Sequence, residues 1–292
     1  MQHRREMWLI VLVALLAASG SACPQLVQQY NAPLPRALPP APTLDQVMRA
    51  VNANSEQIQS FTAMRATLSG PGFPTLRAVV AFERPMRFRL QAETAFTGPE
   101  LDLGSNDQAF WFWVRRNQPP ALYFCRHDQF ATCPARQYIP IEPQWLVEAL
   151  GIAQFDPRLP YQGPHYLPGD RLEIRAILET PQGPQTRVTV IDAIHAVILQ
   201  QSIYDARGQL VAAAQASQHR RDPLTGLVMP TMVTIQSPSA QLTLQINLGP
   251  LQINRPGTTT PAYWTPPSFP GTPAVDLCDP RLQLAPPAMV GR

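Results

Sequence analysis

The feature that most restricts the fold is a strict alternation of apolar and polar residues between Met86 and Glu93. The apolar members are Met86, Phe88, Leu90 and Ala92, and Arg87, Arg89, Gln91 and Glu93 stand between them. This period of two is typical of a β-strand with one dry and one wet face. Turn signals at Arg84-Pro85 and at residues 105–107 flank it, and an aromatic strand with rings on both faces follows at residues 110–113. The stretch therefore predicts an antiparallel meander.

Similar strand patterns recur along most of the chain, separated by turns every 8 to 12 residues or so. Before the meander they cover Met64–Leu68, where Met64, Ala66 and Leu68 share a face, and Leu76–Phe82. After it they cover residues 122–125, 171–178, 188–193, 196–204, 210–216, 228–235 and 242–248. No alternation of strands with helices appears, so we expect an antiparallel sheet.

Two segments predict helices. Thr43 is a suitable N-cap, and apolar residues then recur at helical spacing for about four turns; they are Leu44, Val47, Met48, Val51, Ile58 and Phe61. Residues 143–150 predict a short second helix, because Pro143 lies in its first turn and Gly151 follows its end. The first helix is expected to pack its apolar stripe on the sheet.

The N-terminus carries the pattern of an export signal. Arg4 and Arg5 precede an apolar run at residues 7–18 that is too short for a membrane span, and small residues lead to Cys23. The ending is similar to the lipobox of bacterial lipoproteins, which would make Cys23 the lipidated first residue; simple secretion is the alternative. We therefore expect a signal peptide at residues 1–22, a Pro-rich tether at 23–42, a folded domain at 43–255 and a Pro-rich tail at 256–292 that lies over the domain or is disordered.

The other three cysteines suggest a single disulfide. Cys125 and Cys133 flank a short loop, and an oxidising compartment would favour a bond between them. Cys278 would then remain unpaired if Cys23 carries lipid. Metal binding is disfavoured because neither CxxC nor HxxxH spacing occurs, so no metal and no cofactor are expected.

Composition and motifs argue against several function classes. The net charge is only +3 and no dense basic run with aromatics occurs, which disfavours a nucleic-acid partner. The exported part contains no G-x-S-x-G or H-E-x-x-H motif. His195 with Asp192, and His219, are explained by exposed polar positions and a polar turn. We therefore expect no enzyme and no catalytic residues.

Three segments together resemble the periplasmic lipoprotein carrier and receptor family LolA/LolB. They are IQSFTAMRATL (residues 58–68), FERPMRFRL (82–90) and LDLGSNDQAFWFWV (101–114). The resemblance covers residues 44–116 by pattern and the remainder only by strand count. Gln108 stands near the usual turn glycine, and Arg115-Arg116 replaces the usual Asn/Asp-Pro.

The resemblance implies an α+β fold: a mostly antiparallel, incomplete and unclosed curved barrel of about eleven strands covered by helices. A helix would lid an apolar cavity that takes acyl chains. Arg84 matches the arginine that controls the lid, with a strand-end arginine in a surface pair as the alternative. Candidate cavity residues are Met48, Val51, Phe88, Leu90, Phe110 and Phe112, for each of which plain core packing is the alternative.

Two functions of different class remain. In the first, the protein is a cell-envelope lipoprotein, facing the periplasm from the outer membrane, whose cavity binds a lipid or the acyl chain of a lipoprotein. In the second, it is an envelope interaction module with a filled interior, and its aromatic strand and tail contact a protein partner. The size of the interior cavity separates the two.

Overall fold

The computed structural model describes residues 33–133, 143–181, 183–238, 241–257 and 259–282. The chain divides into two units, Met1–Pro33 and Leu34–Arg292, and every element named below belongs to the second. The predicted signal peptide and Cys23 lie outside the described residues. The helices are α3 (Leu44–Gln57), α4 (His127–Phe130), α5 (Pro143–Val147), the π-helical turn η2 (Glu148–Ile152) and the 3₁₀ helix η3 (Pro261–Trp264).

The strands divide into a large sheet and one small hairpin. The large sheet contains β1 (Ser60–Gly70), β2 (Phe73–Glu83), β3 (Arg87–Thr94), β4 (Gly98–Ser105), β5 (Ala109–Val114), β6 (Leu122–Arg126), β7 (Tyr161–Leu167), β8 (Arg171–Leu178), β9 (Gln185–Asp192), β10 (Ile198–Tyr204), β11 (Leu210–Ser217), β14 (Met232–Ser237), β15 (Leu242–Asn247), β16 (Gln252–Ile253) and β17 (Ala274–Asp276). The hairpin pairs β12 (Arg220–Arg221) with β13 (Val228–Met229).

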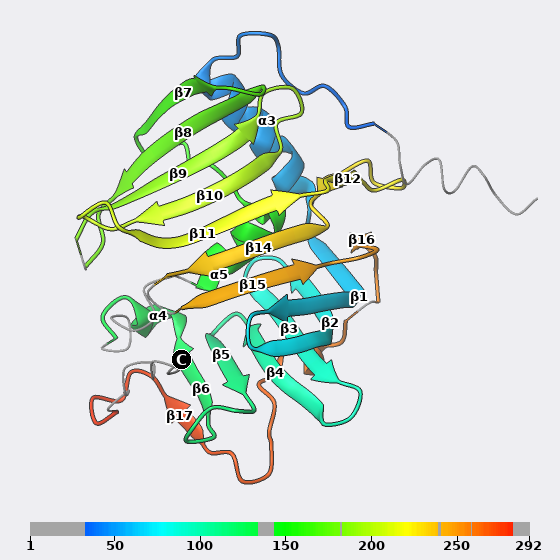
Figure 1. Ribbon diagram of the computed structural model, residues 1–292, viewed down its shortest axis with the longest axis vertical. Helices are drawn as coiled ribbons and strands as arrows, with labels where there is room; N and C mark the ends of the chain where they lie inside the picture. Colours follow the sequence, from blue (N-terminus) through cyan, green and yellow to red (C-terminus); the bar gives the residue numbers. More distant parts are fainter. Residues whose placement is uncertain (1–32, 134–142, 182, 239–240, 258, 283–292) are drawn as a thin grey trace, which may run out of the picture. The chain divides into compact units, whose positions relative to one another are not determined.

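The large sheet has 15 strands in the order β17-β6-β5-β4-β3-β2-β1-β15-β14-β11-β10-β9-β8-β7, and β16 also pairs with β1. Figure 1 shows it running from β7 at one end to β17 at the other, with α3 and α5 against one face. Neighbouring strands are antiparallel except β17 and β6, which are parallel. The two end strands do not pair with each other. This confirms the predicted fold class, a mostly antiparallel and unclosed curved sheet with helices.

One long-range strand pair unites two meanders. The strands β1 to β6 form the first and β7 to β11 with β14 and β15 the second, and β15 returns to pair with β1 through Leu68 opposite Ile246. The strand β7 was not predicted, because a glycine and a proline interrupt its sequence YQGPHYL. The predicted strand 228–235 is divided between β13 and β14 around Pro230.

Helix α3 begins as the sequence predicted but ends earlier. Thr43 forms a capping box with Gln46, in which each side chain accepts a hydrogen bond from the other residue's backbone N–H. The buried stripe consists of Val47, Val51 and Ser55. Ile58 only caps the helix, and Phe61 lies in β1. Both are buried in the sheet's core, so their helical spacing was misleading.

The interior contains two main apolar clusters. In the larger, Trp145, Leu150 and Ile152 of α5 and η2 pack among buried side chains of β1–β3, β11, β14 and β15. In the second, Val47 and Val51 of α3 pack with Leu172 and other residues of β8 and β9. Two different helices therefore cover two different parts of the sheet.

A β-bulge in β1 places Met64 on the opposite face of the strand from the one predicted. The pairing of β1 with β2 shifts register between Ala63 and Ala66, and Met64 is 57% exposed, although we expected it to share the dry face of Ala66. A bulge inserts an extra residue and so reverses the alternation on one side. Simple period-two counting fails at such a position.

The described part of the C-terminal segment, residues 259–282, lies against the sheet. Strand β17 adds to β6, Phe269 stacks on Trp113 with ring centroids 4.0 Å apart, and η3 lies over β3. This covering explains why Arg89, expected on a wet face, is only 6% exposed. Among the described residues, no helix has the length and hydropathy needed to traverse a membrane.

Candidate ligand cavity

An apolar cavity of about 240 Å³ lies between the sheet and the start of α5. Three groups of residues surround it: residues of β3–β5, residues of β14 and β15, and the first turns of α5. Its lining comprises Met86, Phe88, Leu103, Gly104, Ser105, Phe110, Trp111, Phe112, His127, Gln144, Trp145, Leu146, Val147, Ile235, Leu242 and Leu244. One water needs about 10–15 Å³ by a comparable measure, so the space is far larger than a few waters.

Strand β5 builds one wall because large rings alternate between its faces. Phe110 packs edge-on against Phe130 at 5.1 Å, and Phe112 stacks on Tyr123 at 5.1 Å. Trp111 and Trp113 belong to a separate cluster with Leu122. The two faces are therefore covered by different parts of the chain, as the four consecutive rings required.

Trp111 needs the glycine opposite it on β4. The two residues are paired across the strands, and a Cβ on Gly104 would lie 2.1 Å from Cζ2 of the Trp111 ring. The missing side chain thus makes room for the indole, whose Nε1 donates to Asp102 Oδ1 at 3.0 Å.

His127 is one of three polar residues in the lining, with Ser105 and Gln144. Its Nε2 lies 2.9 Å from the carbonyl oxygen of Asn106 and 3.3 Å from Oγ of Ser105. A carbonyl oxygen only accepts, so Nε2 carries the proton and donates to it. An imidazole held this way orients the β4–β5 turn and cannot take a proton from Ser105 through Nε2.

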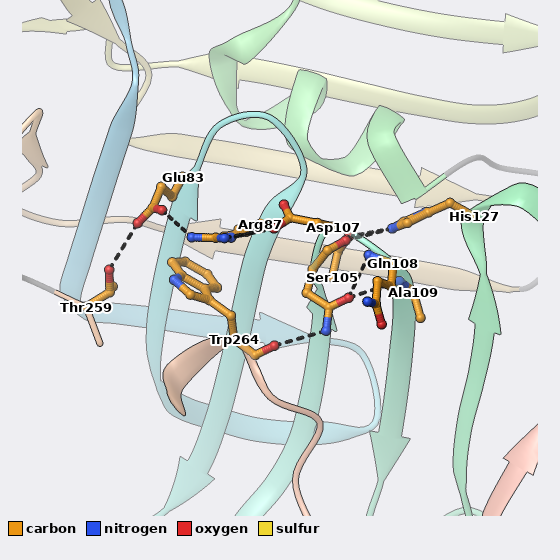
Figure 2. Close-up of polar contacts among 10 residues, drawn as sticks. Glu83, Arg87, Ser105, Asp107, Gln108, Ala109, His127, Thr259 and Trp264 are labelled. Atoms are coloured by element: carbon orange, nitrogen blue, oxygen red, sulfur yellow. Dashed lines mark hydrogen bonds and ion pairs between the residues drawn. The ribbon is translucent and has the colours of Figure 1, made fainter. Parts of the chain in front are cut away.

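Hydrogen bonds and ion pairs to neighbouring elements hold the β4–β5 turn beside the cavity (Figure 2). Within the turn, Asn106 Oδ1 accepts from the backbone N–H groups of Gln108 and Ala109, and its Nδ2 donates to the carbonyl of Trp264. Arg87 donates to Asp107 at 2.8 and 3.1 Å and to Glu83 at 2.7 Å. The turn is thereby tied to β2, β3, α4 and the C-terminal segment.

The residues predicted to line a cavity fall into three places. Phe88, Phe110 and Phe112 surround the cavity described here. Val51 borders a smaller hollow of about 120 Å³ beside α3, and Met48 packs in the cluster of that helix. Leu90 is fully buried in the main core. The structure therefore brings three of the six together.

The helix over this cavity is α5 rather than the first helix. Its apolar run Trp145, Leu146 and Val147 supplies the lining, and β15 supplies Leu242 and Leu244. These residues were not predicted as cavity residues. The sequence offered one signal for them, the run of three consecutive apolar residues in a short helix. Consecutive residues point to different sides of a helix, so no side of this helix is entirely polar and solvent-facing.

Arg84 closes the C-terminal end of α3. Its Nε donates to the carbonyl of Ile58 at 2.9 Å and its Nη2 to the carbonyl of Ser55 at 2.7 Å. No basic residue lies in the last turn of α3 itself, so Arg84 supplies the cation that a helix C-terminus favours. Burial lowers the pKa of Arg84, and the charge of Glu56 partly opposes this.

The three described cysteines meet at the edge of the sheet. Cys125, Cys133 and Cys278 are free thiols, and the Cys125–Cys133 disulfide is not present. Cys278, expected to remain unpaired if Cys23 carries lipid, lies with its Sγ 3.0 Å from Sγ of Cys125 because β17 pairs with β6. Burial raises the pKa of the Cys125 thiol to about 11.

His195 and His219 make contacts that hold local structure. Asp192 accepts from the backbone of Ile194 and His195 in a turn, and Nδ1 of His195 lies 3.0 Å from the carbonyl of Pro35. His219 binds the carbonyl of Ile198 at 3.0 Å through Nε2. It was expected in a solvated turn but is half-buried beside α3.

No protein-family model and no curated protein matches the sequence. Similar solved structures include a domain described as an outer membrane lipoprotein-sorting protein from Vibrio parahaemolyticus, with 11% identity, a TM-score of 0.50, and coverage of 75% of this chain and 94% of that one. A DUF1329 family protein from Desulfovibrio piger has 13% identity, a TM-score of 0.49, and coverage of 75% and 94%. A LolA superfamily protein from Nitrosomonas europaea has 11% identity, a TM-score of 0.44, and coverage of 74% and 95%.

At such low sequence identities, only a similar fold can be inferred, and this inference depends on the Vibrio parahaemolyticus domain. Together with the strand order and the unpaired end strands, it supports one conclusion: the chain has the same fold as that domain, an open antiparallel barrel around helices.

Proposed function

We propose that the protein binds a lipid, or the acyl chain of a lipoprotein, in the cavity between β3–β5, β14–β15 and α5. The cavity itself is the observation that supports this, because it is large, apolar and bordered by Phe88, Phe110 and Phe112. By the same proposal the protein works in the cell envelope, facing the periplasm, and is anchored in the outer membrane through lipid on Cys23.

The chemistry of the lining suits an acyl chain. Each methylene that leaves water contributes about 0.8 kcal/mol, and the lining offers rings and branched aliphatic side chains to receive it. Another hollow, of about 230 Å³, is less suitable, because Glu148, Asp156 and Arg187 line it. Arg187 and Glu148 form an ion pair there at 3.3 Å.

A binding assay with delipidated protein tests the proposal. We expect saturable uptake of a fluorescent fatty acid, and quenching of Trp145 fluorescence by a spin-labelled fatty acid. Phe110→Asp should abolish uptake. Because Phe110 is nearly buried, Leu103→Trp is a second variant: its side chain is half-buried in the cavity wall and a larger one should fill the space while the fold is kept.

A matched pair of exposed leucines provides the control. Leu242 borders the cavity and is 40% exposed, whereas Leu224 is 71% exposed in another part of the chain. Leu242→Asp should weaken uptake and Leu224→Asp should not. Equal uptake by all variants, or no uptake by the parent protein at any probe concentration, would rule out a role for this cavity.

The alternative, an interaction module with a filled interior, predicts no cavity beyond a few waters, and the space of about 240 Å³ disfavours it. Anchoring is tested separately. Mass spectrometry of the native protein should find an N-terminal Cys23 carrying acyl groups, and an unmodified N-terminus would favour simple secretion.

A further inference from the structure

The three cysteines at the edge of the sheet form a compact sulfur cluster outside the proposed acyl cavity. Their Sγ atoms all lie within 4.8 Å of one another. Cys125 of β6 and Cys133 of the segment after α4 flank one short loop, whereas Cys278 comes from the turn after β17, 153 positions from Cys125. The approach of Cys278 to the other two is not a consequence of sequence spacing, so it requires a specific tertiary arrangement.

Backbone contacts hold all three cysteines in place. The N–H of Leu277 donates to the carbonyl of Phe124 at 2.8 Å, which aligns Cys278 beside Cys125. The N–H of Cys278 donates to Asp276 at 2.9 Å, and the N–H of Cys133 to Phe130 at 3.2 Å. The sulfurs therefore meet on a framework of backbone hydrogen bonds.

The spacing suits a small metal ion. Metal–thiolate bonds of about 2.3 Å place three sulfurs about 4 Å apart around one centre. The Sγ atoms of Cys125 and Cys278 are 3.0 Å apart, and no pair of the three sulfurs is separated by more than 4.8 Å. Displacements of less than about 1 Å would make the triangle regular.

The donor set selects the kind of metal. Thiolates favour soft ions such as Cu(I) and Zn(II). Among the described residues no histidine or carboxylate joins the group of three, and structural zinc almost always takes four ligands, whereas Cu(I) is satisfied by three sulfurs. Phe110, Phe130 and Leu277 pack around the sulfurs, and the partly exposed Cys278 leaves a side open for entry.

We propose that Cys125, Cys133 and Cys278 form a three-thiolate site for Cu(I). An ion there would join β6, the segment after α4 and the C-terminal segment, and so fasten β17 to the edge of the sheet.

An anaerobic titration of the reduced protein with Cu(I), against a chromophoric Cu(I) chelator, tests the site. The parent for the titration is Cys23→Ser, so that the three clustered cysteines are the only thiols in the chain. We expect one Cu(I) per chain, a sulfur-to-copper charge-transfer band, and a rise in the melting temperature on binding. Cys278→Ser should weaken binding by more than the about 10- to 100-fold loss typical of second-shell changes.

The controls separate a metal site from a packing effect. Cys278 is the least buried of the three, so its serine variant is the one expected to fold normally; circular dichroism checks this. Thr132→Ala, beside Cys133, should bind Cu(I) like the parent. Unchanged Cu(I) affinity in Cys278→Ser would overturn the proposal. So would a Cys125–Cys278 disulfide in protein alkylated directly on isolation from cells.

Discussion

Asp102 is a buried carboxylate beneath the C-terminal segment that accepts hydrogen bonds from several side chains. It is 2% exposed and accepts hydrogen bonds from Arg89, Gln91 and Trp111, the arginine approaching both of its oxygens. Asp102→Ala would leave the Arg89 charge buried without its partner. Because such losses cost about 3–5 kcal/mol, we expect a fall of this size in the free energy of unfolding, measured in urea.

An exposed ion pair provides the comparison for Asp102. Arg126 and Asp128 are paired at 2.9 Å, with side chains 53% and 64% exposed. Water screens such a pair, so Asp128→Ala should change the urea midpoint far less. If the two variants lost equal stability, burial of the Arg89–Asp102 pair would not be the cause.

His219 should make stability depend on pH. Burial lowers the pKa of its imidazole below the usual 6.5, despite its hydrogen bond to Ile198. The unfolded chain therefore binds a proton at a higher pH than the folded one does. Stability is full above about pH 6.5 and is lost as the pH falls through the lower folded pKa. His219→Gln should reduce the drop in melting temperature between pH 7 and pH 5.

His165 is the matched control, because it is exposed on β7. His165→Gln should leave the pH dependence of the melting temperature as it is in the parent. An identical pH profile in the parent and in His219→Gln would show that other groups cause the acid sensitivity.

Helix α3 depends on a partner outside itself at its C-terminal end. Arg84→Ala removes two charged hydrogen bonds, to Ser55 and Ile58. Bonds of this kind contribute about 1.5–3 kcal/mol, so we expect a loss of that order in the free energy of unfolding. Arg84→Lys should lose part of it, because one ammonium group cannot reproduce the fixed fork of a guanidinium.

Arg49 serves as the control on the same helix, since it makes only an exposed pair with Asp45. Arg49→Ala should be nearly neutral in urea unfolding. The predicted control of a lid by Arg84 is tested by fatty-acid uptake: altered uptake kinetics in Arg84→Lys would support it. Loss of stability without any change in uptake would leave Arg84 as a helix cap alone.

The C-terminal segment should act as part of the folded domain. Removing residues 258–292 deletes β17, the Phe269 ring on Trp113 and the carbonyls of Tyr263 and Thr265 that accept from Arg89. We expect a lower melting temperature and a red-shifted tryptophan emission, because Trp113 becomes exposed. A chain ending at Leu282 keeps these contacts and should match the parent; equal melting temperatures for all three chains would refute the prediction.

The local sequence pattern predicted the secondary structure correctly where interactions between nearby residues determine it. The alternation of residues 86–93 corresponds to β3, and Thr43 does cap α3. The exceptions each have a tertiary cause. Met64 is exposed by a bulge, and Arg89 is buried under η3. In the candidate site, Phe88, Phe110 and Phe112 were predictable from the strand pattern, whereas the role of α5 was not.

By itself, the sequence determined most of the long strands, their antiparallel pairing with neighbours in the chain, and the start of α3. These follow from the two periodicities of the backbone and from capping, which act over a few residues. Only the tertiary structure decided that β15 pairs with β1, that α5 lies over the apolar cavity, and that Cys278 reaches Cys125. The β1–β15 and Cys125–Cys278 contacts join residues more than a hundred positions apart, and α5 also reaches strands outside its own stretch of sequence. Such contacts form because burial of apolar surface has no direction along the chain.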